Sequence, residues 1–201
     1  MKTIDAIASL VIGEVAALLM LAVSRNLALP VTFIPYFRWL LIVFPLMTLA
    51  AMALGGFIGR RFLFVYQLTK FVLVGGSNFL IDLGVLNFFI AITGISQGFW
   101  AIIFKSLSFL VAVTWSFSWN KFWTFRSLET SSAGRQFIEF FLVTGVGFLI
   151  NIGGFSAIND WIGPHGGIPA KTWASVAATG AAGIGLVWNF LGYKFLVFKK
   201  R

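Results

Sequence analysis

Lys70-Phe-Val-Leu-Val-Gly-Gly-Ser-Asn-Phe-Leu-Ile-Asp82-Leu-Gly84 is the stretch of sequence that decides the fold. It opens an otherwise apolar run from Phe71 to Ile92. That run is long enough to cross a bilayer as an α-helix, which takes about 20 residues. A carboxylate at the depth of Asp82 costs about 3 kcal/mol on insertion scales. We therefore expect Asp82 to be paired, hydrated or functional.

The same pattern recurs later in the chain. It reads Glu139-Phe-Phe-Leu-Val-Thr-Gly-Val-Gly-Phe-Leu-Ile-Asn151-Ile-Gly153, with Asn151 in the place of Asp82. A second pair of similar blocks follows, Trp115 to Arg126 and Trp188 to Lys199. These alignments predict an internal duplication with repeats at 67–126 and 136–199. Each repeat holds two spans, and an even number of spans predicts parallel rather than inverted repeats.

The composition indicates a protein whose solvent is mostly lipid. It is 59% hydrophobic and 10% charged, whereas a soluble domain carries roughly 25% charged residues. The chain has no cysteine and one histidine, His165, so thiol chemistry and a His-pair metal site are excluded. No nucleophile with a base and no phosphate loop are found. We expect a transporter-like protein rather than an enzyme, with no cofactor and no metal.

Six membrane spans are predicted. They are Ile4–Val23, Trp39–Ile58, Phe71–Ile92, Phe99–Trp119, Phe137–Trp161 and Thr172–Leu191. Their continuous apolar character favours helices over β-barrel strands, which alternate and are about half as long. The predicted fold is an all-α integral membrane protein with six transmembrane helices, the last four forming two parallel two-helix repeats. Residues 1–66 form a two-helix extension, and residues 67–201 form a four-helix membrane domain.

The net charge of +9 is distributed in short segments between spans. This pattern is typical of the positive-inside rule and not of a nucleic-acid-binding face. The basic side carries Lys2, Arg60, Arg61, Lys70, Lys121, Arg126, Arg135, Lys194, Lys199, Lys200 and Arg201, and the opposite side carries Arg25, Arg38 and Lys171. We expect both termini on the cytoplasmic side of the cytoplasmic membrane.

Polar residues share helical faces in three spans. The faces are Gly75, Asn78 and Asp82 in the third span, Lys105, Ser108, Ala112, Trp115 and Trp119 in the fourth, and Thr144, Gly147 and Asn151 in the fifth. Three such stripes predict a bundle interior that is partly polar. Stripes of small residues, such as Ser9, Gly13 and Ala17, indicate close helix packing and are compatible with a homo-oligomer.

Several ionisable residues each allow two or more interpretations. Lys105 can extend to the interface, pair with Asp82, or bind an anionic head group. Glu14, in the first span, is either a proton-coupling group or an acid hydrogen-bonded within the bundle. Arg126, like Lys121 and Lys194, is either a boundary anchor among aromatic residues or a ligand for a lipid phosphate.

These segments resemble the GtrA-like family, the membrane module shared with some dolichyl-phosphate mannose synthases. The resemblance rests on Lys70–Gly84, Lys105, Asn120–Phe125, Phe140–Asn151 and Asn189–Phe198, and it covers about 67–201. It implies a membrane protein of surface polysaccharide assembly that moves polyprenyl-phosphate-linked monosaccharides between leaflets, beside a polyprenyl-phosphate glycosyltransferase. The chain departs from the usual four-span core in its extra first pair of spans. It also has no acid at Asn151 and no second lysine aligned with Lys105, so any site is expected to be asymmetric.

Under this resemblance the polar residues become candidates for substrate binding. They are Asp82, Lys105, Asn78, Asn151, Trp115, Trp119, Lys121, Arg126, Asn189 and Lys194. The lysines and arginine would bind phosphate, the amides and Asp82 would hydrogen-bond the head group, and the tryptophans would pack on sugar or isoprenoid. Two other functions stay open at this point. One is a membrane anchor that recruits a polyprenyl-phosphate glycosyltransferase, and the other is a proton-coupled exporter of small cations centred on Glu14 and Asp82.

Overall fold

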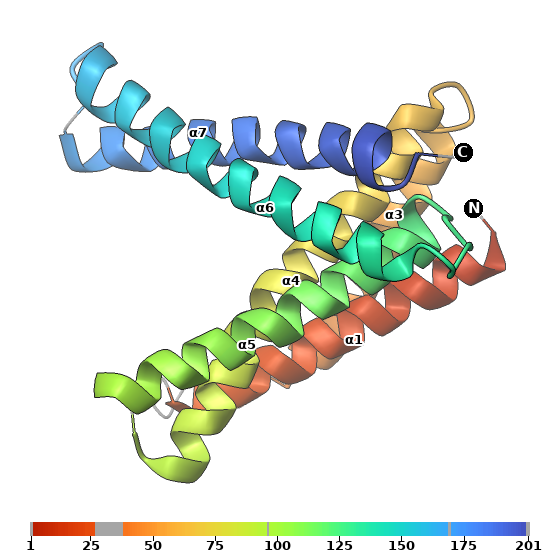
Figure 1. Ribbon diagram of the computed structural model, residues 1–201, viewed down its shortest axis with the longest axis horizontal. Helices are drawn as coiled ribbons and strands as arrows, with labels where there is room; N and C mark the ends of the chain where they lie inside the picture. The colour runs from red at the N-terminus through yellow and green to blue at the C-terminus, as the bar shows by residue number, and fades with distance from the viewer. Residues whose placement is uncertain (1, 27–37, 96, 169, 200–201) are drawn as a thin grey trace. The chain divides into compact units, whose positions relative to one another are not determined.

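The computed structural model describes residues 2–26, 38–95, 97–168 and 170–199, and no strand occurs among them. The long helices are α1 (Thr3–Asn26), α3 (Leu40–Ile58), α4 (Leu63–Thr93), α5 (Gly98–Trp119), α6 (Ala133–Ser156) and α7 (Ala170–Gly192) (Figure 1). Six helical segments in the described residues are long and apolar enough to cross a membrane. The predicted all-α, six-span fold is confirmed. Lys200 and Arg201, predicted on the basic side, lie outside the described residues.

Helix α4 begins at Leu63, about two turns before the predicted start at Phe71. Its first turns contain polar residues, which lower the local hydropathy and hide the helix from a search for apolar runs. These polar groups face neighbouring helices: Tyr66 and Lys70 contact Asp5 of α1, and Thr69 lies against Gly55 of α3. The helix ends at Gly94, whose φ of 72° is in the left-handed region that glycine adopts without strain.

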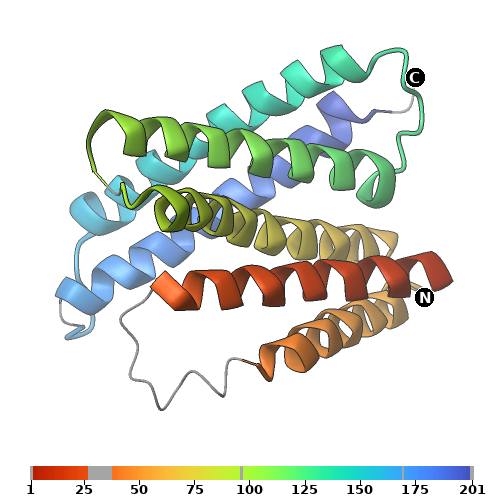
Figure 2. The same cartoon turned by 90° about the horizontal axis from the view of Figure 1, so that it is seen from below.

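The chain forms two compact units, Met1–Arg126 and Ser127–Arg201. In the first unit α1 packs against α3 and α4, and α4 packs in turn against α5, as Figures 1 and 2 both show. Its buried core contains Ala8, Ile12, Met52, Val74 and Trp123. The second unit is the helix pair α6 and α7. The extra N-terminal pair of helices thus packs with the first repeat, and the division at residue 66 stays a prediction.

Helices α1 and α3 approach closely at the predicted stripe of small residues. A Cβ atom built on Gly13 would lie 2.6 Å from the Cα of Pro45, so only a residue without a side chain fits there. The Thr48 hydroxyl lies 2.8 Å from the carbonyl oxygen of Ser9 and donates a hydrogen bond across the interface. Small residues allow close packing of helices in the bilayer, where the hydrophobic effect contributes little to helix association.

Both repeats end in a π-helical turn at the same place. The turn η2 (Asn120–Thr124) follows α5, and η4 (Tyr193–Val197) follows α7. The two turns close on equivalent hydrogen bonds, Phe125 N to Asn120 O at 2.9 Å and Phe198 N to Tyr193 O at 2.8 Å. Since π-helical turns are rare, their occurrence at aligned positions supports the duplication. A further π-helical segment, η3 (Ala157–Ile162), extends α6, whereas α4 ends without one.

Candidate functional site

Polar contacts run along the interface between α4 and α5. Near the start of α4, Lys70 lies beside Trp123 of η2, with its ammonium 5.2 Å from the ring centroid. Farther along α4 toward its C-terminal end, the indole Nε1 of Trp115 donates to the Ser77 hydroxyl at 3.0 Å. Closer still to that end, Asp82 contacts α5. We call these three levels the polar ladder. At a rise of 1.5 Å per residue, Lys70 and Asp82 are about 18 Å apart along the helix axis, which is more than half of a hydrocarbon core.

The top level of the polar ladder joins the two predicted charges. Lys105 forms an ion pair with Asp82, and the Ser108 hydroxyl donates to the same carboxylate at 2.6 Å. Asp82 is mostly buried, whereas Lys105 is 52% exposed at its side chain. The ion pair and the hydroxyl give the carboxylate partners inside an apolar span, as its position in the sequence requires. The lysine keeps an open side from which it can reach another anion.

A row of tryptophans lies beside the ladder. The ring centroids of Trp115 and Trp119 are 5.3 Å apart, and those of Trp119 and Trp123 are 5.6 Å apart. A hollow of about 400 Å³ between α1 and α5 is lined by Ile4, Ile7, Ala8, Val11, Ser118, Trp119, Phe122 and Trp123. A second hollow of about 600 Å³ continues over Leu110, Val111, Thr114, Trp115, Ser118 and Trp119. We call the two together the tryptophan groove; its lining is largely apolar.

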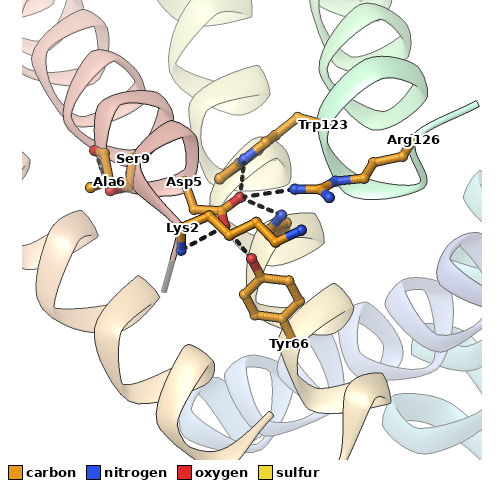
Figure 3. Close-up of polar contacts among 8 residues, drawn as sticks. Lys2, Asp5, Ala6, Ser9, Tyr66, Trp123 and Arg126 are labelled. Atoms are coloured by element: carbon orange, nitrogen blue, oxygen red, sulfur yellow. Dashed lines mark hydrogen bonds and ion pairs between the residues drawn. The ribbon is translucent and has the colours of Figure 1, made fainter. Parts of the chain in front are cut away.

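The bottom level of the ladder is a buried charge cluster around Asp5, which is fully buried in the first turn of α1 (Figure 3). One carboxylate oxygen lies 2.5 Å from Lys70 Nζ, 3.0 Å from Trp123 Nε1 and 3.8 Å from an Arg126 nitrogen. The other accepts hydrogen bonds from the Tyr66 hydroxyl and from the backbone N–H of Lys2, the latter at 3.3 Å. Four side chains thus converge on one carboxylate from α1: two from α4, Tyr66 and Lys70, and two from the end of the first repeat, Trp123 and Arg126.

Sequence reasoning did not propose Asp5, Tyr66, Lys70 or Trp123 as site residues; of this cluster it named only Arg126. Asp5 lies at the end of an apolar span, where charged residues are common, so its position in the sequence does not indicate a functional site. The one available signal was the presence of opposite charges, Asp5 and Lys70, each at the start of a span on the same predicted side of the membrane. Because the two residues belong to different spans, no helical spacing links them.

The predicted site residues of the second repeat lie between α6 and α7. A Cβ built on Gly147 would lie 2.9 Å from the Asn189 side-chain carbon Cγ, and one built on Gly185 would lie 3.6 Å from the Asn151 Cβ. Thr144 and Tyr193 share a hydrogen bond of 2.7 Å between their hydroxyl oxygens. The predicted polar face of the fifth span therefore packs against α7.

The predicted cationic residues occupy different environments. Lys121 is fully buried in η2, with its ammonium 5.6 Å from the Phe122 ring centroid. The Arg126 side chain is 42% exposed, and its φ of 52° turns the backbone at the end of the first repeat. Lys194 is half-buried, and its ammonium lies 5.7 Å from the Phe190 ring centroid. Of the three, Arg126 is the one that joins the Asp5 cluster.

Glu14 lies apart from the ladder. It lines a hollow of about 470 Å³ with Leu10 and Val11 of α1 and with residues of α3. Among the described residues its carboxylate forms no hydrogen bond or ion pair. Its proton-coupling role stays a prediction. Within the same part of the chain, no three His, Asp or Glu side chains are grouped in a way that could hold a metal ion.

Both repeats contain buried amide oxygens that lack hydrogen bonds. The Oδ1 atoms of Asn78, Asn120 and Asn189 have no hydrogen-bond partner among the described residues. Buried polar atoms in proteins almost always have partners, so an orphaned acceptor needs an explanation. Two of these residues, Asn78 and Asn189, were predicted as substrate-binding residues, and their free acceptors suit a ligand that donates hydroxyl groups.

Comparison with known proteins identifies the family. A family model described as "GtrA/DPMS, transmembrane domain" matches residues 70–198, more than half of the chain. No curated protein and no solved structure matches the chain significantly. The match begins at Lys70 and ends at Phe198, so it covers nearly all of the two predicted repeats and leaves α1 and α3 outside. The chain is a multi-pass membrane protein that belongs to the GtrA/DPMS transmembrane-domain family, with a role connected to polyprenyl-phosphate-linked sugars.

Proposed function

We propose that this protein translocates a polyprenyl-phosphate-linked monosaccharide across the cytoplasmic membrane for the synthesis or modification of cell-surface polysaccharide. The observation that carries the proposal is the polar ladder, which runs beside the apolar tryptophan groove. A phosphate and a sugar cannot cross hydrocarbon unaided, because unpaired polar groups there cost several kcal/mol each, on the order of 4–8 for a hydroxyl. Polar side chains between two helices lower that cost, while the isoprenoid tail stays in apolar surroundings.

In this proposal the anionic phosphate moves between cationic groups at the two ends of the ladder. Arg126 is accessible at one end, and Lys105 is accessible at the other. Lys105 is already paired with Asp82. A phosphate that binds Lys105 therefore replaces the Asp82 carboxylate as the partner of the ammonium group. Asn78 offers a buried acceptor for sugar hydroxyls at a level between these two charges. We propose matching acceptor roles for Asn151 and Asn189 in the second repeat, and phosphate-directed roles for Lys121 and Lys194.

The distribution of charge gives the proposed orientation. Arg126 and the other basic residues of the Lys70 end would face the cytoplasm, with both termini, by the positive-inside rule. Asp82 and Lys105 would then lie toward the outer leaflet. The proposed partners are membrane lipid and a polyprenyl-phosphate glycosyltransferase that charges the carrier, and the small-residue stripes are compatible with self-association.

The test is transport by purified protein in liposomes that contain polyprenyl-phosphate glucose. Periodate added outside oxidises only sugars exposed on the outer leaflet, so the oxidised fraction reports translocation. We expect Lys105→Ala and Asp82→Ala each to reduce the translocation rate at least tenfold, because each removes one partner of the ion pair. Ser106→Ala, an exposed change on the same helix whose hydroxyl bonds only the Ile102 carbonyl within the described residues, is the matched control. Wild-type rates in both charge variants would refute the proposed path.

The exposed basic residues favour a second candidate, a membrane anchor for the glycosyltransferase. Arg60 and Arg61 are exposed in the link between α3 and α4, and Arg135 is exposed at the start of α6. If anchoring is the function, changing these three to glutamine should abolish co-purification of the transferase, whereas Asp82→Ala should not. Retention of the transferase by the triple variant would rule out anchoring through these three residues.

A further inference from the structure

The donors around Asp5 form a preassembled set. The Lys70 ammonium lies 4.3 Å from the Tyr66 ring centroid and 5.2 Å from that of Trp123. Cation–π contacts of this kind stabilise a desolvated ammonium independently of any anion. Arg126 closes the set from the end of the first repeat. We call Tyr66, Lys70, Trp123 and Arg126 the cradle.

The cradle and its anion come from different parts of the chain. Three of the four cradle residues lie within the region 70–198 that the family model matches, and Tyr66 lies one turn before it on the same helix. Asp5 lies on α1, outside that region. The family domain therefore supplies the donors, and the N-terminal extension supplies the carboxylate that they hold.

The cradle suits a phosphate group at least as well as a carboxylate. A phosphodiester carries one negative charge and has two non-bridging oxygens, like the carboxylate of Asp5. Lys70 and Arg126 together bring two positive charges to one carboxylate. Charge-assisted hydrogen bonds from lysine and arginine are the usual means of phosphate recognition. The aligned positions of the second repeat hold Glu139 and Leu196 in place of Lys70 and Trp123, so only the first repeat has this donor set.

The tryptophan groove lies next to the cradle and offers a binding site for the apolar tail of a ligand. Trp123 donates to Asp5 through Nε1 and also lines the hollow between α1 and α5. Ile4, Ile7 and Val11 of α1 line the opposite wall. An amphiphile whose phosphate lay in the cradle would thus have an apolar hollow of about 400 Å³ next to its head group for the first part of its tail.

We infer that the cradle of Tyr66, Lys70, Trp123 and Arg126 is a binding site for the phosphate of an amphiphilic lipid, and that Asp5 occupies it as a tethered internal anion. The lipid displaces the carboxylate when the first turn of α1 moves aside, and the N-terminal extension thereby competes with substrate entry. The identity of the lipid as a polyprenyl phosphate rests on the proposed function, whereas the anion site does not.

The test replaces Asp5, the tethered anion, and adds inorganic phosphate as a free anion. Full-length protein in detergent is heated in sodium phosphate or in sodium chloride of equal ionic strength, and unfolding is followed by tryptophan fluorescence. For Asp5→Ala at about ten times the phosphate dissociation constant, we expect the Tm to rise by about 3–6 °C relative to chloride. The wild type should rise by less than a third of that, since its cradle is occupied. Asp5→Asn, which keeps the size of the side chain, serves the same comparison if the alanine variant does not fold.

The matched control is Asp5→Ala combined with Lys70→Ala, which should lose the phosphate response because the strongest donor is gone. Equal responses to phosphate and chloride in both single Asp5 variants would overturn the inference and leave Asp5 as a purely structural partner of Lys70.

A second arm separates free phosphate from a lipid head group. Citronellyl phosphate, a ten-carbon isoprenoid phosphate, should bind Asp5→Ala at least tenfold more tightly than inorganic phosphate in calorimetric titrations. Adding Trp119→Ala, which changes the groove and leaves the cradle intact, should remove that advantage without weakening inorganic phosphate. Equal binding of the two ligands would overturn the lipid assignment and leave an anion site for free phosphate. Because no transport is measured, failure of the proposed function would leave these results unchanged.

Discussion

Replacing Lys70 by methionine should destabilise the protein strongly, because it leaves a buried carboxylate without its closest cation. The Lys70 and Asp5 side chains are 1% and 0% exposed and lie 2.5 Å apart. Breaking a buried ion pair by removing one partner typically costs about 3–5 kcal/mol. Asp5 would keep its Trp123 hydrogen bond and Arg126 at 3.8 Å, so we expect the lower end, about 3 kcal/mol. At about 2–4 °C per kcal/mol, this lowers the Tm by about 6–12 °C.

The assay is thermal unfolding in detergent followed by tryptophan fluorescence, with two comparison variants. Arg135→Met breaks an exposed i, i+4 pair with Glu139, whose side chains are 52% and 32% exposed. Such a pair contributes about 0.5 kcal/mol, so the Tm should fall by no more than about 2 °C. The double variant Asp5→Leu, Lys70→Met removes both buried charges but leaves the Tyr66 hydroxyl and the Trp123 indole without their acceptor. Its loss should therefore be smaller than the sum of the two single losses, though not zero. A Lys70→Met variant no less stable than Arg135→Met, or a double variant that shows additive losses, would refute the reasoning.

Two further stability predictions follow from the helix contacts. Gly13→Val should lower the unfolding free energy by about 1–3 kcal/mol, because its Cβ would lie 2.6 Å from the Cα of Pro45 and push α1 away from α3. The control is Gly183→Ala, whose Cβ would meet nothing within 4 Å and which should leave the Tm unchanged or raise it. Equal losses of stability in the two variants would contradict the close approach of α1 and α3. Tyr193→Phe should cost about 1 kcal/mol in the same assay, because it removes the 2.7 Å hydrogen bond to Thr144 and keeps the ring; an unchanged Tm would mean that this hydrogen bond adds nothing to the packing of α6 on α7.

The spans and the upper ion pair could be predicted because each depends on local pattern. A run of about 20 apolar residues fixes a membrane helix by length alone. Asp82 and Lys105 stood out because a charge inside such a run needs a partner, and they lie on consecutive helices where a partner is near. The start of α4 was predicted too late, since Tyr66 and Lys70 face protein, not lipid, and hydropathy does not distinguish polar groups that face other helices.

The Asp5 cluster could not be predicted from local pattern, because it depends on how three separated segments pack. Asp5, Lys70 and Trp123 belong to α1, α4 and η2, and only the packing of α1 on α4 brings the carboxylate to the indole. The burial of Lys121 is a similar case. Its position at the end of a span suggested a boundary anchor, but the π-helical turn places it inside the protein.

The paired π-helical turns bear on the predicted duplication. Each ends its helix with a bond from a backbone N–H to the carbonyl oxygen five residues earlier, which gives the last turn a wider backbone than an α-helical turn. The turns at Asn120–Thr124 and Tyr193–Val197 occupy aligned positions, and each has lysine as its second residue. Under the predicted duplication, the wide turn and its lysine belong to the helix pair that was copied. The charge differences at Asp82/Asn151 and Lys70/Glu139 would then be later changes in two copies with the same turn.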